Sequence, residues 1–314
     1  MSISKHIKKV GRGAKGAGDL SRPEAKDALD HILRGQASDL ELGAFCLAMR
    51  IKAESSDELA GFLDAVEDGH LGKVHVTSDR PVLVLPSYNG ARKTPNWVPL
   101  LALLLAREKI PVLIHGNEAD EKRTTSMEIF QALGVTIATS IDDVTRELNR
   151  GAPVFAPLRV LSPELNRLLN VRQEIGLRNF GHVLAKLINP IACSSLSIFS
   201  YTHPVYPGTM QNMFKMRPGN CIVMRGHEGE PIASLQRLPS MMQFQASTPE
   251  TPYSTEEIQF SPPEATVAID AASTAKQIRL MLAGKMAIPE SIQAQLDEIL
   301  RMMASMQNTS NSKK

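Results

Sequence analysis

The feature that most constrains the fold is a short apolar segment held between two prolines, Pro81 and Pro86. Its four central residues, Val-Leu-Val-Leu, leave no polar position, and such a run is typical of a strand buried on both faces of a sheet. Further short apolar runs alternate with segments of helical periodicity. The strand-like runs are 112–115, 154–156, 196–199 and 221–225, and the helical segments include about 96–107 and 125–133. This alternation predicts an α/β fold with a mainly parallel sheet flanked by helices.

The first quarter of the chain predicts a small helical subdomain. Three segments of helical spacing begin at Ser21, Ser38 and Ser56, and short loops separate them. The second helix runs through the apolar residues Leu40, Phe45, Leu47 and Met49 to Lys52, and we expect Cys46, on its apolar face, to lie in the core. We therefore predict two domains. The first is residues 1–73, joined in space by helices from about 163–188, and the second is an α/β domain of residues 74–314.

Composition excludes several classes of protein. Of 314 residues, 43% are hydrophobic and 22% are charged, so the chain is not wholly disordered. Its three cysteines stand far apart without a CxxC pair, which predicts no zinc ribbon and no disulfide framework, and the odd number fits a reducing cytoplasm. The longest apolar run, Val98 to Ala106, is too short to cross a bilayer. We expect a cytoplasmic protein without a membrane partner.

Positive charge is concentrated at the N-terminus. Residues 1–26 contain seven Lys or Arg against two acids, although the whole chain carries a net charge of only +2. The side chains that form this basic arm are Lys5, Lys8, Lys9, Arg12 and Lys15. Such an arm can contact phosphates, or it can be a solvated and partly disordered terminus, and charge alone does not decide between the two.

Two loops follow predicted strands and lead into helices, where free N–H groups favour an anion. The first runs from Pro86 to Asn96, and its Asn89-Gly90 turn, Arg92 and Lys93 indicate a phosphate site. The alternative is an Asn-Gly turn whose two cations are merely solvated. The second loop, from His115 to Arg123, contains acids and is a poor anion site by itself.

Separate segments in the same order resemble the anthranilate phosphoribosyltransferases of glycosyltransferase family 3. These segments are Ala48–Lys52, Glu58–Gly61, His115–Asn117, Ala132–Val135, Gly176–Phe180 and Leu187–Pro190. The resemblance implies the fold of these enzymes and of type II nucleoside phosphorylases. It also implies phosphate or ligand contacts by Asn89, Gly90, Arg92, Lys93, Thr94, Asn96, His115, Gly116, Asn117 and Arg172. If the chain is catalytic, the resemblance implies magnesium at Glu228 and Glu230.

The chain departs from the family pattern at the phosphate loop. Pro86-Ser-Tyr-Asn-Gly90 stands where the family has Gly-Thr-Gly-Gly-Asp, and Pro86 has no N–H group to donate. Tyr88 places a large ring in the loop, while Ile114 and Glu118 replace two cations of the family. Because phosphoryl leaving groups need concentrated cationic stabilisation, we expect the family reaction to be lost, with no catalytic residue and no cofactor.

The altered segments are most similar to the YbiB-type branch of the family. That resemblance implies a homodimer formed through the helical subdomain, which binds DNA and RNA through the phosphate backbone without sequence preference. The implied nucleic-acid contacts are Lys5, Lys8, Lys9, Arg12, Lys15, Arg92, Lys93, Arg178 and Lys186. Two other functions stay open: an active phosphoribosyltransferase that uses an anthranilate-like or different acceptor, and a sensor of a small phosphorylated ligand.

Overall fold

The computed structural model describes residues 2–13, 15–261 and 268–311, and the chain divides into two compact units. The first consists of Met1–Gly72, Leu158–Pro190 and Pro207–Arg217. The second consists of Lys73–Pro157, Ile191–Tyr206 and Pro218–Lys314. Among the described residues, every strand lies in the second unit, whereas the first is helical.

The helical unit is built on well-capped helices. Its helices are α1 (Ser4–Val10), α2 (Arg22–Leu33), α3 (Asp39–Lys52), α4 (Ser56–Gly69), α8 (Leu158–Leu161), α9 (Pro163–Ile175), α10 (Gly181–Leu184) and α11 (Tyr206–Met216). The Ser before each of α2, α3 and α4 forms a capping box with the Glu three residues later. The third cap is Ser55, so the predicted Ser56 was wrong by one residue.

An aromatic cluster fills the centre of the helical unit. The rings of Phe45, Phe62 and Phe180 lie 4.9 to 6.3 Å apart between centroids, and all three are fully buried. They come from α3, α4 and the residue before α10. Aromatic pairs at such distances add to the stability that burial of their area supplies.

Helix α3 has one buried apolar face, and the expected burial of Cys46 is confirmed. Phe45 and Met49 are buried with it, whereas Leu40 is 84% exposed and Leu47 is 45% exposed. Ile51 is exposed as well, so α3 carries a second apolar face that the rest of the unit does not cover. Periodicity alone does not show which of two apolar faces of a helix is buried.

The helical unit also includes α11, which the sequence analysis assigned to the α/β domain. Polar contacts hold it there: the Ser56 hydroxyl donates to the Thr209 carbonyl at 3.0 Å, and Arg217 pairs with Glu67 at 2.6 Å. Arg217 also pairs with Asp64, as does Arg22 at 2.6 Å. Most of these contacts join residues about 150 positions apart, which no local pattern reveals.

The basic arm is folded at its start. The segment Ser4–Val10 forms α1, with His6 and Val10 buried, so the partly disordered alternative is wrong for these residues. His6 Nε2 lies 2.7 Å from Asp27 Oδ2. Lys5 pairs with the same Asp27 at 3.0 Å.

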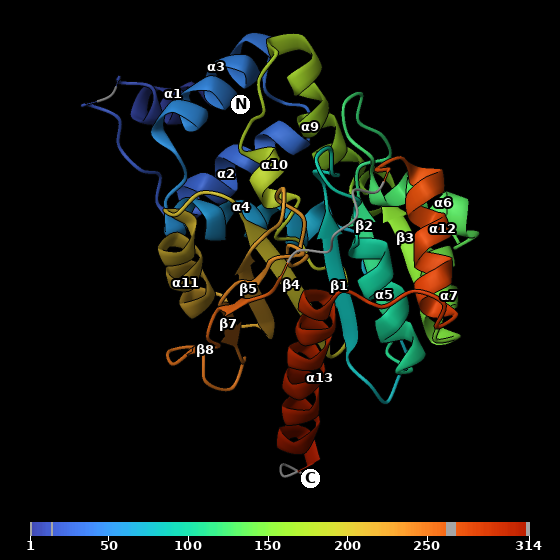
Figure 1. Cartoon of the computed structure of the whole chain (residues 1–314). Coiled ribbons are helices and arrows are strands. Elements are labelled where there is room, and N and C mark those ends of the chain that lie inside the picture. The colour runs from blue at the N-terminus through green and yellow to red at the C-terminus, as the bar shows by residue number, and fades with distance from the viewer. Residues whose placement is uncertain (1, 14, 262–267, 312–314) are drawn as a thin grey trace. The chain divides into compact units, whose positions relative to one another are not determined.

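The second unit is an α/β domain around one large sheet (Figure 1). Its strands are β1 (Val82–Ser87), β2 (Val112–Gly116), β3 (Val154–Pro157), β4 (Ser195–Tyr201), β5 (Cys221–Arg225), β6 (Arg237–Leu238), β7 (Met241–Phe244), β8 (Tyr253–Ser254) and β9 (Ile258–Gln259). Its helices are α5 (Val98–Arg107), α6 (Ser126–Leu133), α7 (Ile141–Asn149), α12 (Ala271–Leu282) and α13 (Glu290–Asn311).

The sheet has seven strands in the order β3-β2-β1-β4-β5-β7-β8. The first five are parallel, and β7 and β8 join antiparallel at one edge, while β6 and β9 form a separate pair. The predicted α/β fold with a mainly parallel sheet is confirmed. The segment 242–264, which is rich in Pro, Thr, Ser and Glu, contains most of β7 and all of β8, and its last residues lie outside the described ones.

The main core lies between the sheet and the helices α5, α6, α12 and α13. Leu83 and Leu85 of β1 and Ile114 of β2 face this core, and the helices supply mainly Leu, Ile and Met. Pro86 fits inside β1 because the pairing of β1 with β4 runs only from Val82 to Val84, so the proline interrupts no ladder hydrogen bond to β4. None of the described helices is both long and apolar enough to cross a bilayer.

Gly61 is required for the close packing of α2 on α4. A Cβ at this position would lie 2.2 Å from the Arg22 carbonyl oxygen, so Gly61→Ala forces the two helices apart. We expect the unfolding free energy to fall by about 2 kcal/mol, measured by urea denaturation. Gly69→Ala is the matched control at the end of the same helix, where an added Cβ meets nothing. Equal stability of the two variants would contradict this account.

Candidate functional site

The loops that follow β1 and β2 meet the turn that follows β5 at the carboxyl edge of the sheet, where ligands bind in open α/β folds. Gly116 allows the ends of β1 and β2 to approach closely, because a Cβ there would lie 1.8 Å from the Ser87 carbonyl oxygen. Nine of the predicted ligand residues, Asn89 to Asn117, lie in these two loops or at the strand ends that precede them.

A buried carboxylate occupies the turn after β1. Glu230 is fully buried, and its Oε1 accepts the backbone N–H groups of Asn89 at 2.6 Å and Gly90 at 2.7 Å. The Ser87 hydroxyl donates to Oε2. The N–H groups that could have received an external anion are therefore bonded to the chain itself.

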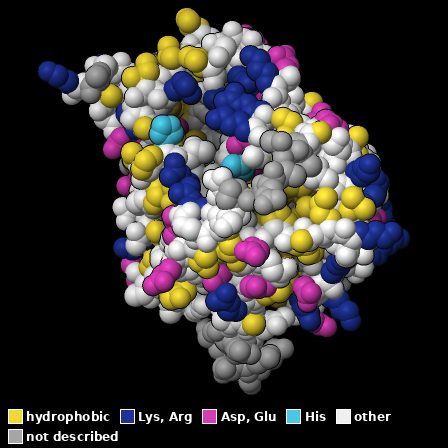
Figure 2. All heavy atoms as spheres, in the orientation of Figure 1, with side chains coloured by type: hydrophobic (Ala, Val, Ile, Leu, Met, Phe, Trp, Pro, Cys, Tyr) yellow, Lys and Arg dark blue, Asp and Glu magenta, His cyan; other side chains and the backbone are white. Residues whose placement is uncertain are grey.

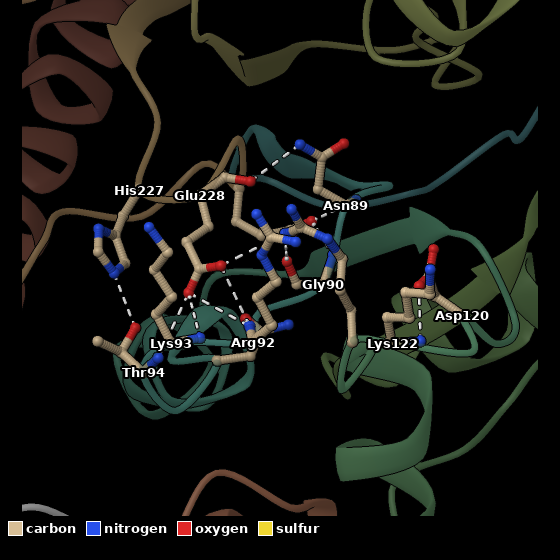
Figure 3. Close-up of polar contacts among 12 residues, drawn as sticks. Asn89, Gly90, Arg92, Lys93, Thr94, Asp120, Lys122, His227 and Glu228 are labelled. Atoms are coloured by element: carbon tan, nitrogen blue, oxygen red, sulfur yellow. Dashed lines mark hydrogen bonds and ion pairs between the residues drawn. The ribbon is translucent and has the colours of Figure 1, made fainter. Parts of the chain in front are cut away.

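A second carboxylate, that of Glu228 in the turn after β5, lies against residues 92–94 of the loop after β1. The backbone N–H groups of Arg92 and Lys93 donate to Glu228 at 3.1 and 2.9 Å, and that of Thr94 donates at 3.3 Å (Figure 3). The guanidinium of Arg123 lies 3.4 Å from the same carboxylate. Unlike these backbone groups, the side chains of Arg92 and Lys93 are exposed, and neither forms an ion pair with another described residue.

Further hydrogen bonds hold this turn against the loop. Thr94 Oγ1 lies 2.7 Å from His227 Nε2, and burial lowers the pKa of His227. The Asn89 side chain donates to the Glu228 carbonyl at 2.9 Å. The loop after β1 and the turn after β5 are thus joined along most of their length.

Asn96, one of the ligand residues implied by the family resemblance, lies in a buried network of hydrogen bonds. Its Oδ1 accepts the N–H group of Val98 at 3.2 Å at the start of α5, and its Nδ2 donates to Ser126 Oγ at 3.1 Å. Ser126 Oγ lies 2.6 Å from Ser87 Oγ, so a buried chain of hydrogen bonds runs from Asn96 to Glu230.

Tyr88 and His115 form a buried pair beside this chain. The Tyr88 hydroxyl lies 2.8 Å from His115 Nδ1, the rings meet edge to face at 5.5 Å, and Tyr88 is only 3% exposed. Burial raises the pKa of Tyr88 well above its ordinary value. Asn117 donates to the Tyr88 carbonyl at 2.9 Å. His115 and Asn117 therefore support the loop from inside, and Tyr88 is packed into the interior of the unit.

The two acids do not fit a magnesium site. Both oxygens of Glu230 accept hydrogen bonds from N–H or O–H groups. The hydrogen atoms of these donors lie where a magnesium ion would have to coordinate the same oxygens. Among the described residues, no group of three His, Cys, Asp or Glu side chains is arranged to hold a metal ion. The implied metal role of Glu228 and Glu230 is therefore not supported by their geometry.

Predicted binding residues of the helical unit converge on His182. Burial is the main reason why the pKa of His182 falls to about 3, and the positive charges of Arg178, Arg172 and Lys186 lower it further. The Arg50 guanidinium donates to the Arg178 carbonyl at 2.7 Å. We call Arg50, Arg172, Arg178 and Lys186 the His182 cluster. Figure 2 shows Lys and Arg side chains gathered near α3 and α9 of this unit.

The basic arm divides into paired and exposed cations. Lys5 pairs with Asp27 at 3.0 Å and Lys9 with Glu24 at 2.6 Å, and the Lys9 contact is the main reason why the pKa of Glu24 falls to about 2. Lys8, Arg12 and Lys15 are exposed. Arg50 and Arg123 were not predicted as binding residues, and the only local signal for Arg123 was its place at the end of the loop after β2.

Comparison with known proteins places this architecture. Residues 4–68 match the family model described as "Glycosyl transferase family, helical bundle domain". The chain is 37% identical over 300 residues to the uncharacterized protein YbiB of Escherichia coli K12, covering 94% of this chain and 92% of that protein. It is 31% identical over 212 residues to the anthranilate phosphoribosyltransferase of Rhodococcus jostii, covering 67% of this chain and 58% of that enzyme.

Solved structures agree with this assignment at the level of the fold. The anthranilate phosphoribosyltransferase of Thermus thermophilus has a TM-score of 0.75 at 19% identity, covering 97% of this chain and 96% of that chain. The enzyme of Saccharomyces cerevisiae, in complex with phosphoribosyl pyrophosphate (PRPP) and Mg, has a TM-score of 0.74 at 14% identity, covering 96% and 89%. The chain belongs to the anthranilate phosphoribosyltransferase-like proteins of glycosyltransferase family 3.

Tyr88→Phe tests whether the buried hydroxyl contributes to the loop. The variant removes the hydrogen bond to His115 and leaves that buried ring nitrogen without this partner, so we expect the unfolding free energy to fall by about 1 kcal/mol in chemical denaturation. Tyr253→Phe in the same unit removes a hydroxyl from a ring that is 66% exposed and should change stability little. An unchanged midpoint for Tyr88→Phe would show that the hydroxyl is dispensable.

Proposed function

We propose that this chain is a homodimer that binds DNA and RNA through the phosphate backbone without sequence preference, and that it has lost the transferase reaction of its family. One observation carries the proposal. The backbone donors of the loop after β1 are bonded to Glu228 and Glu230, whereas the Arg92 and Lys93 side chains of the same loop are exposed.

The first half of that observation argues against a diphosphate substrate. A diphosphate is held by converging N–H donors and cations, often with a metal ion. Here the converging donors already face two carboxylates, which also repel a phosphate at the same place. Turnover of PRPP would require the turn after β5 to move away from the loop after β1. That movement would break the hydrogen bonds of Glu230, which is fully buried.

The second half favours a long polyanion. Long cationic side chains at a surface contact phosphates wherever the backbone of a nucleic acid presents them, and they carry no information about the bases. Each unit offers such side chains: Arg92 and Lys93 in the α/β unit, and the His182 cluster in the helical unit. Aromatic residues make up only 4% of the chain, which does not favour a platform on which bases stack.

The exposed face of α3 supports the homodimer. Leu40, Leu47 and Ile51 lie on one side of this helix at spacings of seven and four residues, and all three are exposed. Small residues stand between them, Gly43 and Ala44, which allow another helix to approach closely. Association of two copies through this face would bury an apolar stripe that a monomer leaves in water.

An active phosphoribosyltransferase is the second candidate, and family membership favours it. It predicts magnesium-dependent consumption of PRPP with anthranilate or a related acceptor. The assay follows pyrophosphate release by the wild-type chain, because any acceptor releases the same product. Release above the background of an acceptor-free control would overturn the proposed loss of the reaction. Pyrophosphate release does not report binding without turnover, so the sensor hypothesis requires a separate titration with PRPP.

Removing the two exposed cations of the loop should weaken binding to every nucleic acid alike. For the double variant Arg92→Gln, Lys93→Gln we expect about tenfold weaker binding to each of two oligonucleotides whose sequences are unrelated to each other, measured by fluorescence anisotropy titration. On duplex DNA, the slope of log affinity against log salt should fall by about 0.9 for each phosphate that the variant no longer neutralises.

The double variant Lys276→Gln, Lys285→Gln is the control. It removes the same charge from exposed positions on and after α12 of the same unit, far along the chain from the loop. Its affinity and salt slope should stay close to those of the wild type. Equal losses in both double variants would mean that only net charge matters, and unchanged affinity in both would remove the loop from the interface.

Leu47→Glu tests the dimer. A charge in the centre of the exposed α3 stripe should convert a dimer into monomers, observed as a halved mass in sedimentation equilibrium, without a change in circular dichroism. Val205→Glu places a charge at an exposed apolar residue of the other unit and should leave the mass unchanged. A wild-type chain that sediments as a monomer would refute this part of the proposal.

A further inference from the structure

The Glu228 carboxylate lies in a place that has the donor set of an anion site. Three consecutive backbone N–H groups, of residues 92–94, face it at 2.9 to 3.3 Å. The guanidinium of Arg123 lies 3.4 Å from the same carboxylate and also donates to the Gly90 carbonyl at 3.0 Å. Successive N–H groups that converge on one point form the concavities in which proteins hold phosphate. We call residues 92–94 with Arg123 the donor seat.

The backbone around Glu228 is also unusual. Glu228 has a φ of +50° and Gly229 a φ of +86°, and a residue with a Cβ seldom adopts the left-handed region. Such a conformation persists where surrounding contacts hold it. Here the contacts are those of the carboxylate with the donor seat and that of the Glu228 carbonyl with Asn89 at 2.9 Å. The conformation of the turn places the Glu228 carboxylate against the donor seat.

We propose that Glu228 is an internal competitor for phosphate: its carboxylate excludes single phosphate and diphosphate groups from the donor seat, which binds them once the carboxylate is removed. The ligand class is an inorganic phosphate or a terminal phosphoryl group. The inference concerns the loop discussed above, but it holds whether or not the chain binds nucleic acid.

The competition favours the internal carboxylate for a simple reason. The turn holds it against the donors, so its effective concentration is far above that of a dissolved ligand. A small phosphate therefore meets only the flexible side chains of Arg92 and Lys93, which hold it weakly. A polyanion bridges many such side chains at once and needs no donor seat. Glu228 would thus separate long polyanions from small phosphates.

The experiment compares four proteins: the wild type, Glu228→Ala, Glu228→Gln and the control Glu256→Ala. Glu256 is an exposed acid of the same unit with no described polar contact, so the control matches the change in charge. Sodium pyrophosphate and inorganic phosphate are titrated by calorimetry with EDTA present, and sodium chloride at equal ionic strength corrects for screening. Melting temperatures are recorded under the same conditions.

Glu228→Ala should bind pyrophosphate at least about tenfold more tightly than the wild type and gain thermal stability from it, because it regains charge-assisted hydrogen bonds to the empty donors. Glu228→Gln should lie between the two, since its amide oxygen still fills the seat without a charge. Adding Arg123→Gln to Glu228→Ala should abolish the gain, which locates the site.

Two results would overturn the proposal. One is a folded Glu228→Ala that binds pyrophosphate no better than the wild type or Glu256→Ala. The other is a Glu228→Ala that does not fold, is not restored by pyrophosphate in circular dichroism, and is accompanied by a folded Glu228→Gln without any gain. Nucleic-acid affinity is not a readout here, so failure of this proposal and failure of the proposed function are separate outcomes.

Discussion

The fully buried carboxylate of Glu230 is the contact on which the functional edge of this protein depends. A buried charge costs several kcal/mol of desolvation unless donors replace the water that it gives up. Here two backbone N–H groups and the Ser87 hydroxyl do so. Because β4 lies between β1 and β5 in the sheet, this one side chain joins loops from strands that do not touch. It holds the backbone of the loop after β1 at Asn89 and Gly90.

The consequence for function follows from the supply of donors. A loop of this length offers few N–H groups, and those of Asn89, Gly90 and residues 92–94 are all directed at acids of the same chain. Like a phosphate-binding loop, this loop has converging N–H donors. The groups that accept their hydrogen bonds are carboxylates of the same chain instead of a phosphate. The side chains of Arg92 and Lys93 are left outside this arrangement, so the only strong attraction that the loop offers to an external anion is through long, mobile cations.

The sequence predicted the frame of the fold well and the site only in part. Short apolar runs such as Val112–His115 and Cys221–Arg225 became strands β2 and β5 within one residue at either end, because a run without polar positions fits few structures. The exposure of Leu40 and the burial of Phe45 on α3 could not be predicted, because the two residues look alike in a hydropathy pattern. The self-bonding of Glu228 and Glu230 was out of reach, since it joins residues about 140 positions apart. The sequence indicated which residues lie in these loops, but it could not indicate the hydrogen-bond partners of their side chains.

The charge of a segment indicates its binding partners only when the fold shows which of its charged side chains are already paired. The N-terminal segment looks strongly basic, yet Lys5 and Lys9 already pair with Asp27 and Glu24, so part of its field is cancelled within the unit. An exposed ion pair of this kind adds little stability, and a phosphate can compete with the carboxylate for the lysine. Elsewhere in the same unit, burial lowers the pKa of His182, and the positive charges of Arg178, Arg172 and Lys186 lower it further. In the proposed function, attraction of a polyanion depends on exposed cations such as Lys8, Arg12, Arg92 and Lys93. Contacts of such side chains with phosphates carry no information about the bases, which is why the proposed binding has no sequence preference.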